Sequence, residues 1–323
     1  MDRDVIHVAV AADDLFSMPL TAAARSAILR SDSPATVRIT VIDCGISRRN
    51  RQRIQRSLAV DGAEVRIVAF TDVIPDSALQ GGVIPSAATF ARLFAADYLP
   101  DADRAVYLDS DTIALTDLAA LVDLLEPGML VAGVADGQGD GRVRNIERLL
   151  PLLPTTGVGS GDSPYINAGV LVMDLAAWRR EGVTDRFRAL VDTTPLRFAD
   201  QDAINVVCAG RVQTLPPMWN TQTHLLASEA ASGAASGATS GTASTTGPGG
   251  DAKIFHYTSR PKPWHLHGDI GLAAPWFDAV DHTAWSGWRP TRRRLIVPKL
   301  RRGWRMARTR PRQLLAKYSP GGN

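Results

Sequence analysis

The feature that most constrains the fold of this chain is an alternation of short apolar segments with helix-forming segments. The apolar segments are rich in Val, Ile and Ala, and they occupy residues 5–11, 36–43, 63–70, 104–108, 129–134, 165–172, 212–215 and 253–257. Helices are predicted at residues 17–29, 47–58, 86–98, 174–180, 184–191 and 200–209. Strands that alternate with helices indicate an α/β fold, with a mostly parallel central sheet and helices on both faces.

The composition is that of a globular protein. Apolar residues make up 45% and charged residues 21% of the 323 positions, which excludes whole-chain disorder. The apolar run 168–173 is far shorter than the ~18–20 residues that a membrane helix needs. The first residues lack the pattern of a signal peptide, and two cysteines, Cys44 and Cys208, give no disulfide framework. We therefore expect a cytoplasmic protein.

Charge divides the chain into two parts. No acidic residue follows Asp281, and ten arginines and two lysines lie between positions 289 and 317. The rest has 24 basic and 33 acidic residues, a net charge of −9. We expect a folded domain over residues 1–285 and a basic, aromatic-containing tail over 286–323. Within the domain, 23 of the 26 residues from 227 to 252 are Gly, Ala, Ser or Thr, which predicts a mobile insertion.

Two aspartates directly follow the predicted strand 104–108. If the chain stays extended there, Asp109 and Asp111 point to the same side. Two carboxylates on one side form half of a site for a hard divalent cation such as Mn²⁺ or Mg²⁺. The alternative is a solvated turn that happens to hold two acids. The position favours a site, because ligands of α/β sheets bind at the carboxyl ends of the strands.

Three basic or imidazole side chains could complete such a site, although two of them have a simpler explanation. His256 lies in the predicted strand 253–257 and could be a third metal ligand, but a lone histidine is more often structural. Lys262 could pair with phosphate oxygens. Arg92 lies in a predicted helix, where a lone arginine is usually a solvated charge.

Two short polar motifs have the same ambiguity. Asp200-Gln201-Asp202 opens a predicted helix, where acids are favourable against the helix dipole without any further role. Asn167-Ala168-Gly169 lies at the start of a predicted strand, where Asn and Gly often form only a turn.

Taken together, the order and spacing of these motifs resemble glycosyltransferase family 8, which contains glycogenin-like and lipopolysaccharide galactosyltransferase-like enzymes. The resemblance covers roughly four fifths of the chain. It implies a GT-A fold, which is a Rossmann-like domain for nucleotide-diphospho-sugars, and a retaining hexosyltransferase. The motifs that carry it are Ala11-Ala12-Asp13-Asp14, the helix with Arg92, Tyr107-Leu108-Asp109-Ser110-Asp111, Asn167-Ala168-Gly169-Val170, Asp200-Gln201-Asp202, Trp219-Asn220 and the block from His256 to Trp264.

The resemblance implies a metal site and a donor site. Asp109, Asp111 and His256 would ligate Mn²⁺, with Mg²⁺ as a substitute, and the cation would stabilise the UDP leaving group as a Lewis acid. The implied binding set for a UDP-hexose is Ala11 beside the nucleoside, Asp13 at the uracil ring, Phe16 stacking near it, Arg92 at the sugar or diphosphate, Lys262 at the diphosphate, Asn167 at sugar hydroxyls, and Ser110, Ala168 and Gly169.

The resemblance also implies a catalytic group. Asp200 would hold sugar hydroxyls, Gln201 would lie near the anomeric carbon, and Asp202 is a further candidate. Retention requires either a covalent intermediate or same-face attack. Because an amide is a weak nucleophile, we favour same-face attack with Gln201 as an electrostatic support. One departure is Ser259, where the family usually has a Gly that lets the backbone approach the diphosphate.

The expected acceptor is a glycan or glycolipid, as in lipopolysaccharide or cell-surface glycan synthesis at the inner membrane face. Basic and aromatic residues of the tail favour an anionic membrane surface, with a solvated tail and, less favoured, nucleic acid as alternatives. Two other functions compete. One is a sugar-nucleotide-binding module without turnover. The other is a haloacid-dehalogenase-like phosphatase, whose pattern requires Thr or Val at the position of Ile113.

Overall fold

The computed structural model describes most of the predicted domain. The described residues are 5–81, 86–136, 149, 152, 164–226, 250–258, 260–266 and 270–291. Ser259, nearly all of the predicted insertion and the predicted tail from residue 292 onward lie outside them. Among the described helices, none has the length and apolar character needed to cross a bilayer.

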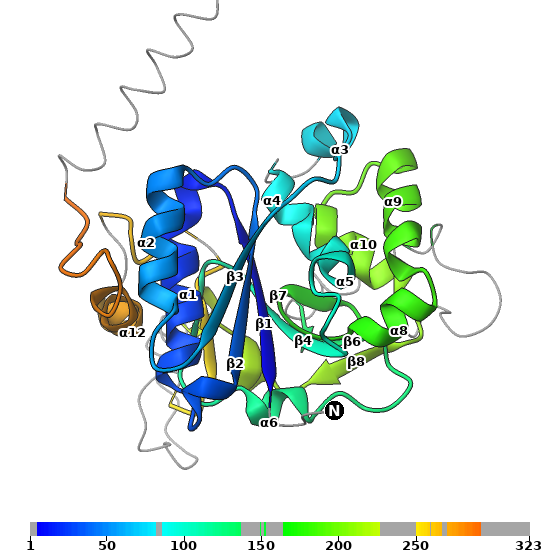
Figure 1. Cartoon of the computed structure of the whole chain (residues 1–323). Helices are drawn as coiled ribbons and strands as arrows, with labels where there is room; N and C mark the ends of the chain where they lie inside the picture. Colours follow the sequence, from blue (N-terminus) through cyan, green and yellow to red (C-terminus); the bar gives the residue numbers. More distant parts are fainter. Residues whose placement is uncertain are drawn as a thin grey trace, which may run out of the picture.

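A seven-stranded sheet forms the centre of the molecule (Figure 1). Its order is β3-β2-β1-β4-β7-β6-β8, and every neighbouring pair is parallel except the two that involve β7. The α/β fold with a mostly parallel sheet is therefore confirmed. The strands are β1 (Ile6–Ala12), β2 (Val37–Asp43), β3 (Glu64–Ala69), β4 (Arg104–Leu108), β6 (Val131–Ala135), β7 (Ile166–Asp174) and β8 (Val212–Leu215).

The reversed direction of β7 positions one of the predicted motifs. Val170 of β7 pairs with Leu108 at the end of β4, and the Asp109 N–H donates to the Gly169 carbonyl oxygen at 2.8 Å. The first residues of β7 therefore lie at the carboxyl edge of the parallel strands. In a parallel strand, Asn167 would lie at the opposite edge, away from Asp109. The sequence pattern predicted this strand but not its direction.

Helices cover both faces of the sheet (Figure 1). Alternate residues of β1 point to opposite faces, so Val8 and Val10 contribute to one core and Ala9 and Ala11 to the other. The first core includes α1 (Ser17–Leu29) and α2 (Arg48–Leu58), and α12 (Ile270–Asp281) packs against α1. The second includes α4 (Ala87–Phe90), α5 (Ala95–Tyr98), α8 (Leu175–Arg180), α9 (Val183–Thr193) and α10 (Ala199–Val207); α3 (Asp76–Gly81) and α6 (Ala119–Val122) are short.

The predicted helix 86–98 is not continuous. It begins as predicted, because the Ser86 side chain accepts the Ala88 N–H at 3.3 Å. It then divides into α4, a 3-10 segment η3 (Ala91–Phe94) and α5. The 3-10 segment carries Arg92, which is buried rather than solvated.

A second, three-stranded sheet was not predicted. It has the order β5-β10-β9, with β5 (Thr112–Ala114), β10 (Ile254–His256) and β9 (Thr221–Gln222). Strands of two or three residues are too short to show a period of two in the sequence. This sheet brings His256 opposite Thr112, immediately after the two aspartates.

The contacts of the folded domain extend beyond residue 285. The Trp288 ring packs on Trp276 with 6.0 Å between the ring centroids. Arg289 forms an ion pair with Asp281 at 2.6 Å. A shortened protein that keeps these contacts must therefore end after Arg289.

Candidate active site and metal centre

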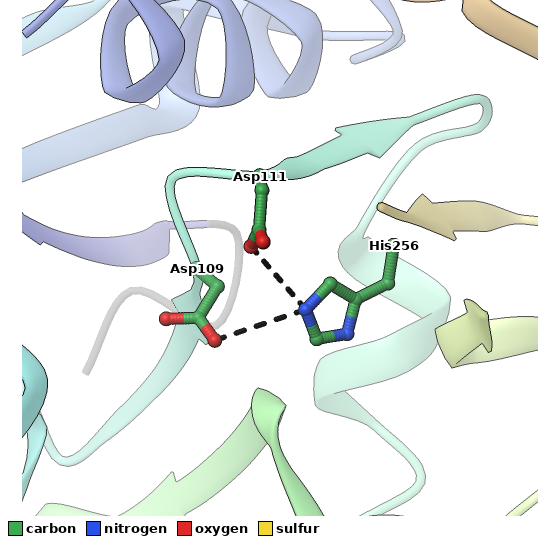
Figure 2. Close-up of side chains that lie close together, drawn as sticks. All are labelled: Asp109, Asp111 and His256. Atoms are coloured by element: carbon green, nitrogen blue, oxygen red, sulfur yellow. Dashed lines mark ion pairs between the residues drawn. The ribbon is translucent and has the colours of Figure 1, made fainter. Parts of the chain in front are cut away.

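Three potential metal ligands converge at the carboxyl edge of β4 (Figure 2). The Nε2 atom of His256 lies 3.3 Å from Asp111 Oδ1 and 3.8 Å from Asp109 Oδ2. One ligand atom from each residue falls within 4.8 Å of the others. Two carboxylates and one imidazole make a mixed O/N donor set, which suits a divalent cation such as Mn²⁺.

The local backbone differs from the expected extended segment. Asp109 to Thr112 form a turn, in which the Asp109 carbonyl oxygen accepts the Thr112 N–H at 3.1 Å and its hydroxyl at 2.8 Å. The expected extended backbone was therefore wrong, although the two carboxylates do lie on the same side. The turn nevertheless directs both carboxylates toward His256, because β5 continues from it and pairs with β10.

A series of hydrogen bonds fixes the orientation of the His256 ring. The Asn167 Oδ1 atom must be an acceptor, because the Gly169 N–H donates to it at 2.9 Å. Asn220 therefore donates its Nδ2 to the same oxygen, also at 2.9 Å. This leaves Asn220 Oδ1 facing His256 Nδ1 at 2.8 Å. An amide oxygen only accepts, so Nδ1 carries the proton and the Nε2 lone pair points to the aspartates.

Asn220 was quoted within a motif but was given no role by the sequence. Replacing it by Ala removes the group that holds the Nδ1 proton, so Mn²⁺ affinity should fall about 10- to 100-fold. Titration of the Mn²⁺ electron paramagnetic resonance signal measures this change. Asn205→Ala is the matched control, because Asn205 is also buried but bonds the backbone of Ile166. Equal Mn²⁺ affinity in both variants would contradict the prediction.

Gly169 leaves the space that the His256 ring occupies. A Cβ atom at position 169 would lie 2.1 Å from His256 Cε1 and under 3.0 Å from both ring nitrogens. Real Cβ atoms do not approach ring atoms so closely. The structure thus gives a steric reason for glycine here, at the position that the resemblance assigned to donor binding.

Arg92 connects the metal centre to the Asp200 motif. Its guanidinium contacts Asp109 at 2.6 and 3.2 Å, Asp200 at 2.8 Å and the Ala168 carbonyl oxygen at 2.5 Å, and it lies 4.5 Å from the Tyr107 ring centroid. Burial raises the pKa of Asp200 to about 7, against the opposing charge of Arg92 and with a further rise from Asp109. Arg92 is thus the buried counter-charge for two carboxylates.

Lys262 contacts the other side of the metal centre. Its Nζ lies 2.5 Å from Asp111 Oδ2 and 2.9 Å from the Thr258 carbonyl oxygen, and it also donates to the Tyr257 carbonyl oxygen. Burial alone would raise the pKa of Asp111, but the neighbouring His256 and Lys262 side chains hold it well below its ordinary value. Asp111 is therefore an anion at neutral pH, as a metal ligand requires.

Gln201 has a fixed amide orientation. Its Oε1 accepts from the Ala168 N–H and from Asn167 Nδ2, both at 3.2 Å. Its Nε2 donates to Asp136 Oδ2 at 2.8 Å and to the Tyr165 hydroxyl at 3.1 Å. Tyr165 in turn donates to the fully buried Asp202 at 2.7 Å. Asp202 thus acts on Gln201 through Tyr165.

Asp136 is a site residue that the sequence reasoning missed. It accepts from Asn167, Gln201 and Gln222, and it is only partly buried. It follows β6 directly, as Asp109 follows β4. The predicted strand 129–134 ends two residues before Asp136, so a search for acids close to a strand end, and not only directly after it, would have found this residue.

The residues expected around the nucleoside lie beside this cluster. β1 and β4 are parallel neighbours with Ala9 opposite Tyr107, which places the buried Ala11 alongside Asp109 and the partly buried Ser110. Asp13 Oδ1 accepts from the N–H groups of Leu15 and Phe16 at 3.0 and 3.2 Å. Phe16 meets Trp264 edge-on, with 6.2 Å between the ring centroids.

Sequence comparisons relate this chain to known proteins. The sequence model of glycosyl transferase family 8 matches residues 7–268. General stress protein A of Bacillus subtilis is 24% identical over 289 residues, which are 88% of this chain and 96% of that protein. A lipopolysaccharide 1,2-glucosyltransferase of Escherichia coli is 26% identical over 216 residues, which are 66% of this chain and 59% of that protein.

Solved structures share the fold. The galactosyltransferase LgtC, determined in complex with donor and acceptor sugar analogs, has a TM-score of 0.66 at 23% identity, over 86% of this chain and 96% of its own. The glycosyltransferase GlyE of Streptococcus pneumoniae has a TM-score of 0.60 at 21% identity, over 85% and 60% of the two chains. The fold is thus GT-A. The residues that match the family span most of the described domain and include the three candidate metal ligands. The chain belongs to glycosyl transferase family 8.

Proposed function

We propose that this glycosyltransferase transfers glucose or galactose from a UDP-sugar to a glycan or glycolipid, with retention of the anomeric configuration and with Mn²⁺ as cofactor. The observation that carries the proposal is the convergence of Asp109, Asp111 and His256 between the cations of Arg92 and Lys262. A diphosphate needs positive charge around it, which Lys262 and a cation held by the three ligands would supply here.

The donor set fits Mn²⁺, with Mg²⁺ as a substitute, and Asp109, Asp111 and His256 would hold the ion. When bound, the cation supplies Lewis-acid stabilisation of the UDP leaving group. Lys262 would donate to a phosphate oxygen through a short movement of its flexible side chain from Asp111. Arg92 has no such freedom, because it is buried and bonded on several sides, so it would orient Asp109 and Asp200.

The bonding of Gln201 supports same-face transfer. Both Nε2 hydrogens have acceptors and Oε1 already accepts two bonds, so this amide is a fixed dipole rather than a free nucleophile. In the proposed step, the bond between the anomeric carbon and the phosphate oxygen breaks. The acceptor oxygen bonds to the same face of that carbon, and its proton passes to the departing phosphate oxygen. Asn167 and Asp200 would bind sugar hydroxyls.

The first test is release of UDP from a panel of UDP-sugars, with Mn²⁺, Mg²⁺ or a chelator and without acceptor. Slow hydrolysis of one UDP-hexose that requires Mn²⁺ is expected, and it identifies the donor. Hydrolysis that is unaffected by the chelator would contradict the metal assignment. UDP binding without hydrolysis, and without transfer to a broad acceptor panel, would instead support a binding module without turnover.

We also propose that the basic tail brings the enzyme to an anionic membrane surface. Arginines alternate there with Trp304 and with aliphatic residues, a composition that suits the interface of anionic lipid. The full chain should sediment with anionic vesicles at low salt and much less at high salt. A protein that ends at Thr291, which keeps the contacts of Trp288 and Arg289, should sediment several-fold less. Equal sedimentation of the two proteins would refute this role of the tail.

A further inference from the structure

Helix α2 carries an unusual density of positive charge. Five of its eleven residues are arginines, and it contains no acidic residue. Ile54, Ser57 and Leu58 are its buried residues, so it packs through one narrow stripe. Like charges three and four residues apart are unfavourable on a helix. Such a sequence is expected where an external anion offsets the repulsion.

Two of the five arginines have a partner within the domain. Arg51 forms an ion pair with Asp43, and the Arg53 guanidinium lies 5.3 Å from the Trp285 ring centroid. Arg48, Arg49 and Arg56 are exposed, and within the described part of the chain no acid forms an ion pair with them. We call these three side chains the basic face of α2.

Both ends of α2 adjoin features that bear on function. At its start, the Ser47 N–H and the Asn50 side chain each donate to Asp14 Oδ1 at 2.8 Å, next to the expected uracil-binding Asp13. At its end, Ser57 Oγ accepts the Ala284 N–H at 2.9 Å. The chain therefore enters the basic segment after residue 288 from a point packed against α2, and Figure 1 shows α1, α2 and α12 gathered on one side of the sheet.

An exposed apolar side chain, Leu15, lies near the start of α2, which is the end of the helix that adjoins the candidate site. Leu15 is 72% exposed and directly follows Asp14, which binds the first turn of α2. A lipid headgroup layer can take both a guanidinium and an aliphatic side chain. Nucleic acid, by contrast, would gain nothing from an aliphatic tip and would favour an aromatic one.

We propose that the basic face of α2, together with Leu15, is a docking surface for anionic lipid headgroups. The surface is part of the folded domain and is distinct from the tail. Binding through this surface would orient the protein with the edge of its donor site facing the bilayer. The proposal does not depend on the enzymatic reaction, because it rests on the charge, exposure and position of α2.

The test compares two triple variants of the full chain on vesicles of phosphatidylcholine with and without phosphatidylglycerol. The first is Arg48→Gln, Arg49→Gln and Arg56→Gln. The control is Arg180→Gln, Arg186→Gln and Arg197→Gln, which removes the same charge from exposed positions at and after α8 and α9, on the other side of the sheet. The first variant should partition to anionic vesicles about tenfold or more weakly than the full chain, because each basic residue near the surface contributes to binding. The control should partition like the unmodified chain.

Several results would overturn the proposal. Equal losses in the two variants would mean that only net charge matters, and no loss in either would mean that α2 does not bind lipid. A single-stranded RNA serves as a second probe in the same series. Loss of RNA binding with unchanged vesicle binding would assign the face to nucleic acid instead. Leu15→Ser should lower vesicle binding without altering RNA binding, and thermal unfolding checks that each variant is folded.

Discussion

Replacing Asp111 by Asn should lower sugar transfer by a factor on the order of 10³ while the protein stays folded. The change removes one of two carboxylates that face His256 and keeps the shape of the side chain. A bound cation stabilises the leaving group by several kcal/mol, and each 1.36 kcal/mol corresponds to a factor of ten in rate. Mn²⁺ titration and UDP release measure the two effects, and both should be lost together.

Two controls make this result specific. Asp123→Asn removes the same charge from an exposed position after α6 and should leave turnover unchanged. Far-ultraviolet circular dichroism should show the same spectrum for Asp111→Asn and the unmodified chain. Full turnover by Asp111→Asn would refute the metal assignment, because an essential ligand cannot be dispensable.

Gly169→Ala should also weaken metal binding strongly, although position 169 has no ligand atom to lose. The new methyl group would overlap the His256 ring, whose Cε1 lies 2.1 Å from the Cβ position. The ring is buried and bonded to Asn220, so it can avoid the methyl group only by breaking that bond. We expect Mn²⁺ affinity to fall at least about 100-fold and stability to fall by about 1–3 kcal/mol.

Gly133→Ala separates the two effects. A Cβ at position 133 would also be crowded, at 2.8 Å from Ile166 Cδ1 and 3.2 Å from Leu171 Cδ2, but it meets no ring atom of His256. This variant should lose stability, by thermal unfolding, and keep its Mn²⁺ affinity. If both alanine variants bind Mn²⁺ equally well, Gly169 does not shape the metal centre.

The sequence predicted most of the fold because the buried strands and their helices leave local signals. β1, β2, β4 and β8 fall within a residue or two of the segments 5–11, 36–43, 104–108 and 212–215, and α1 has the predicted bounds. Direction and lateral order leave no such signal. That is why the reversal of β7 was not predicted, although it brings Asn167 and Gly169 to Asp109.

Part of the candidate site was predictable because some of its residues directly follow a strand that leaves a local signal in the sequence. Asp109 and Asp111 followed from their position after a strand, and their convergence with His256 agrees with the ligand set that the family resemblance implied. The role of Asn220 depends on a tautomer, and the role of Gly169 on a ring that comes from another segment. Neither can be read from local sequence. The sequence could not decide whether Arg92 is a solvated charge or a site residue. The burial of a helical residue depends on what packs over the helix, and distant segments of the chain determine that packing.

The assembly of the metal centre from β4, β5 and β10 also sets an order of events during synthesis. Asp109 and Asp111 are made early, whereas His256 and the Asn220 that orients it come more than a hundred residues later. A nascent chain that has not yet left the ribosome beyond β10 has two of the three expected ligands. The complete set of candidate ligands therefore exists only once β10 has been synthesised. Partial chains that end before β10 lack His256 and should therefore bind Mn²⁺ more weakly than the full chain.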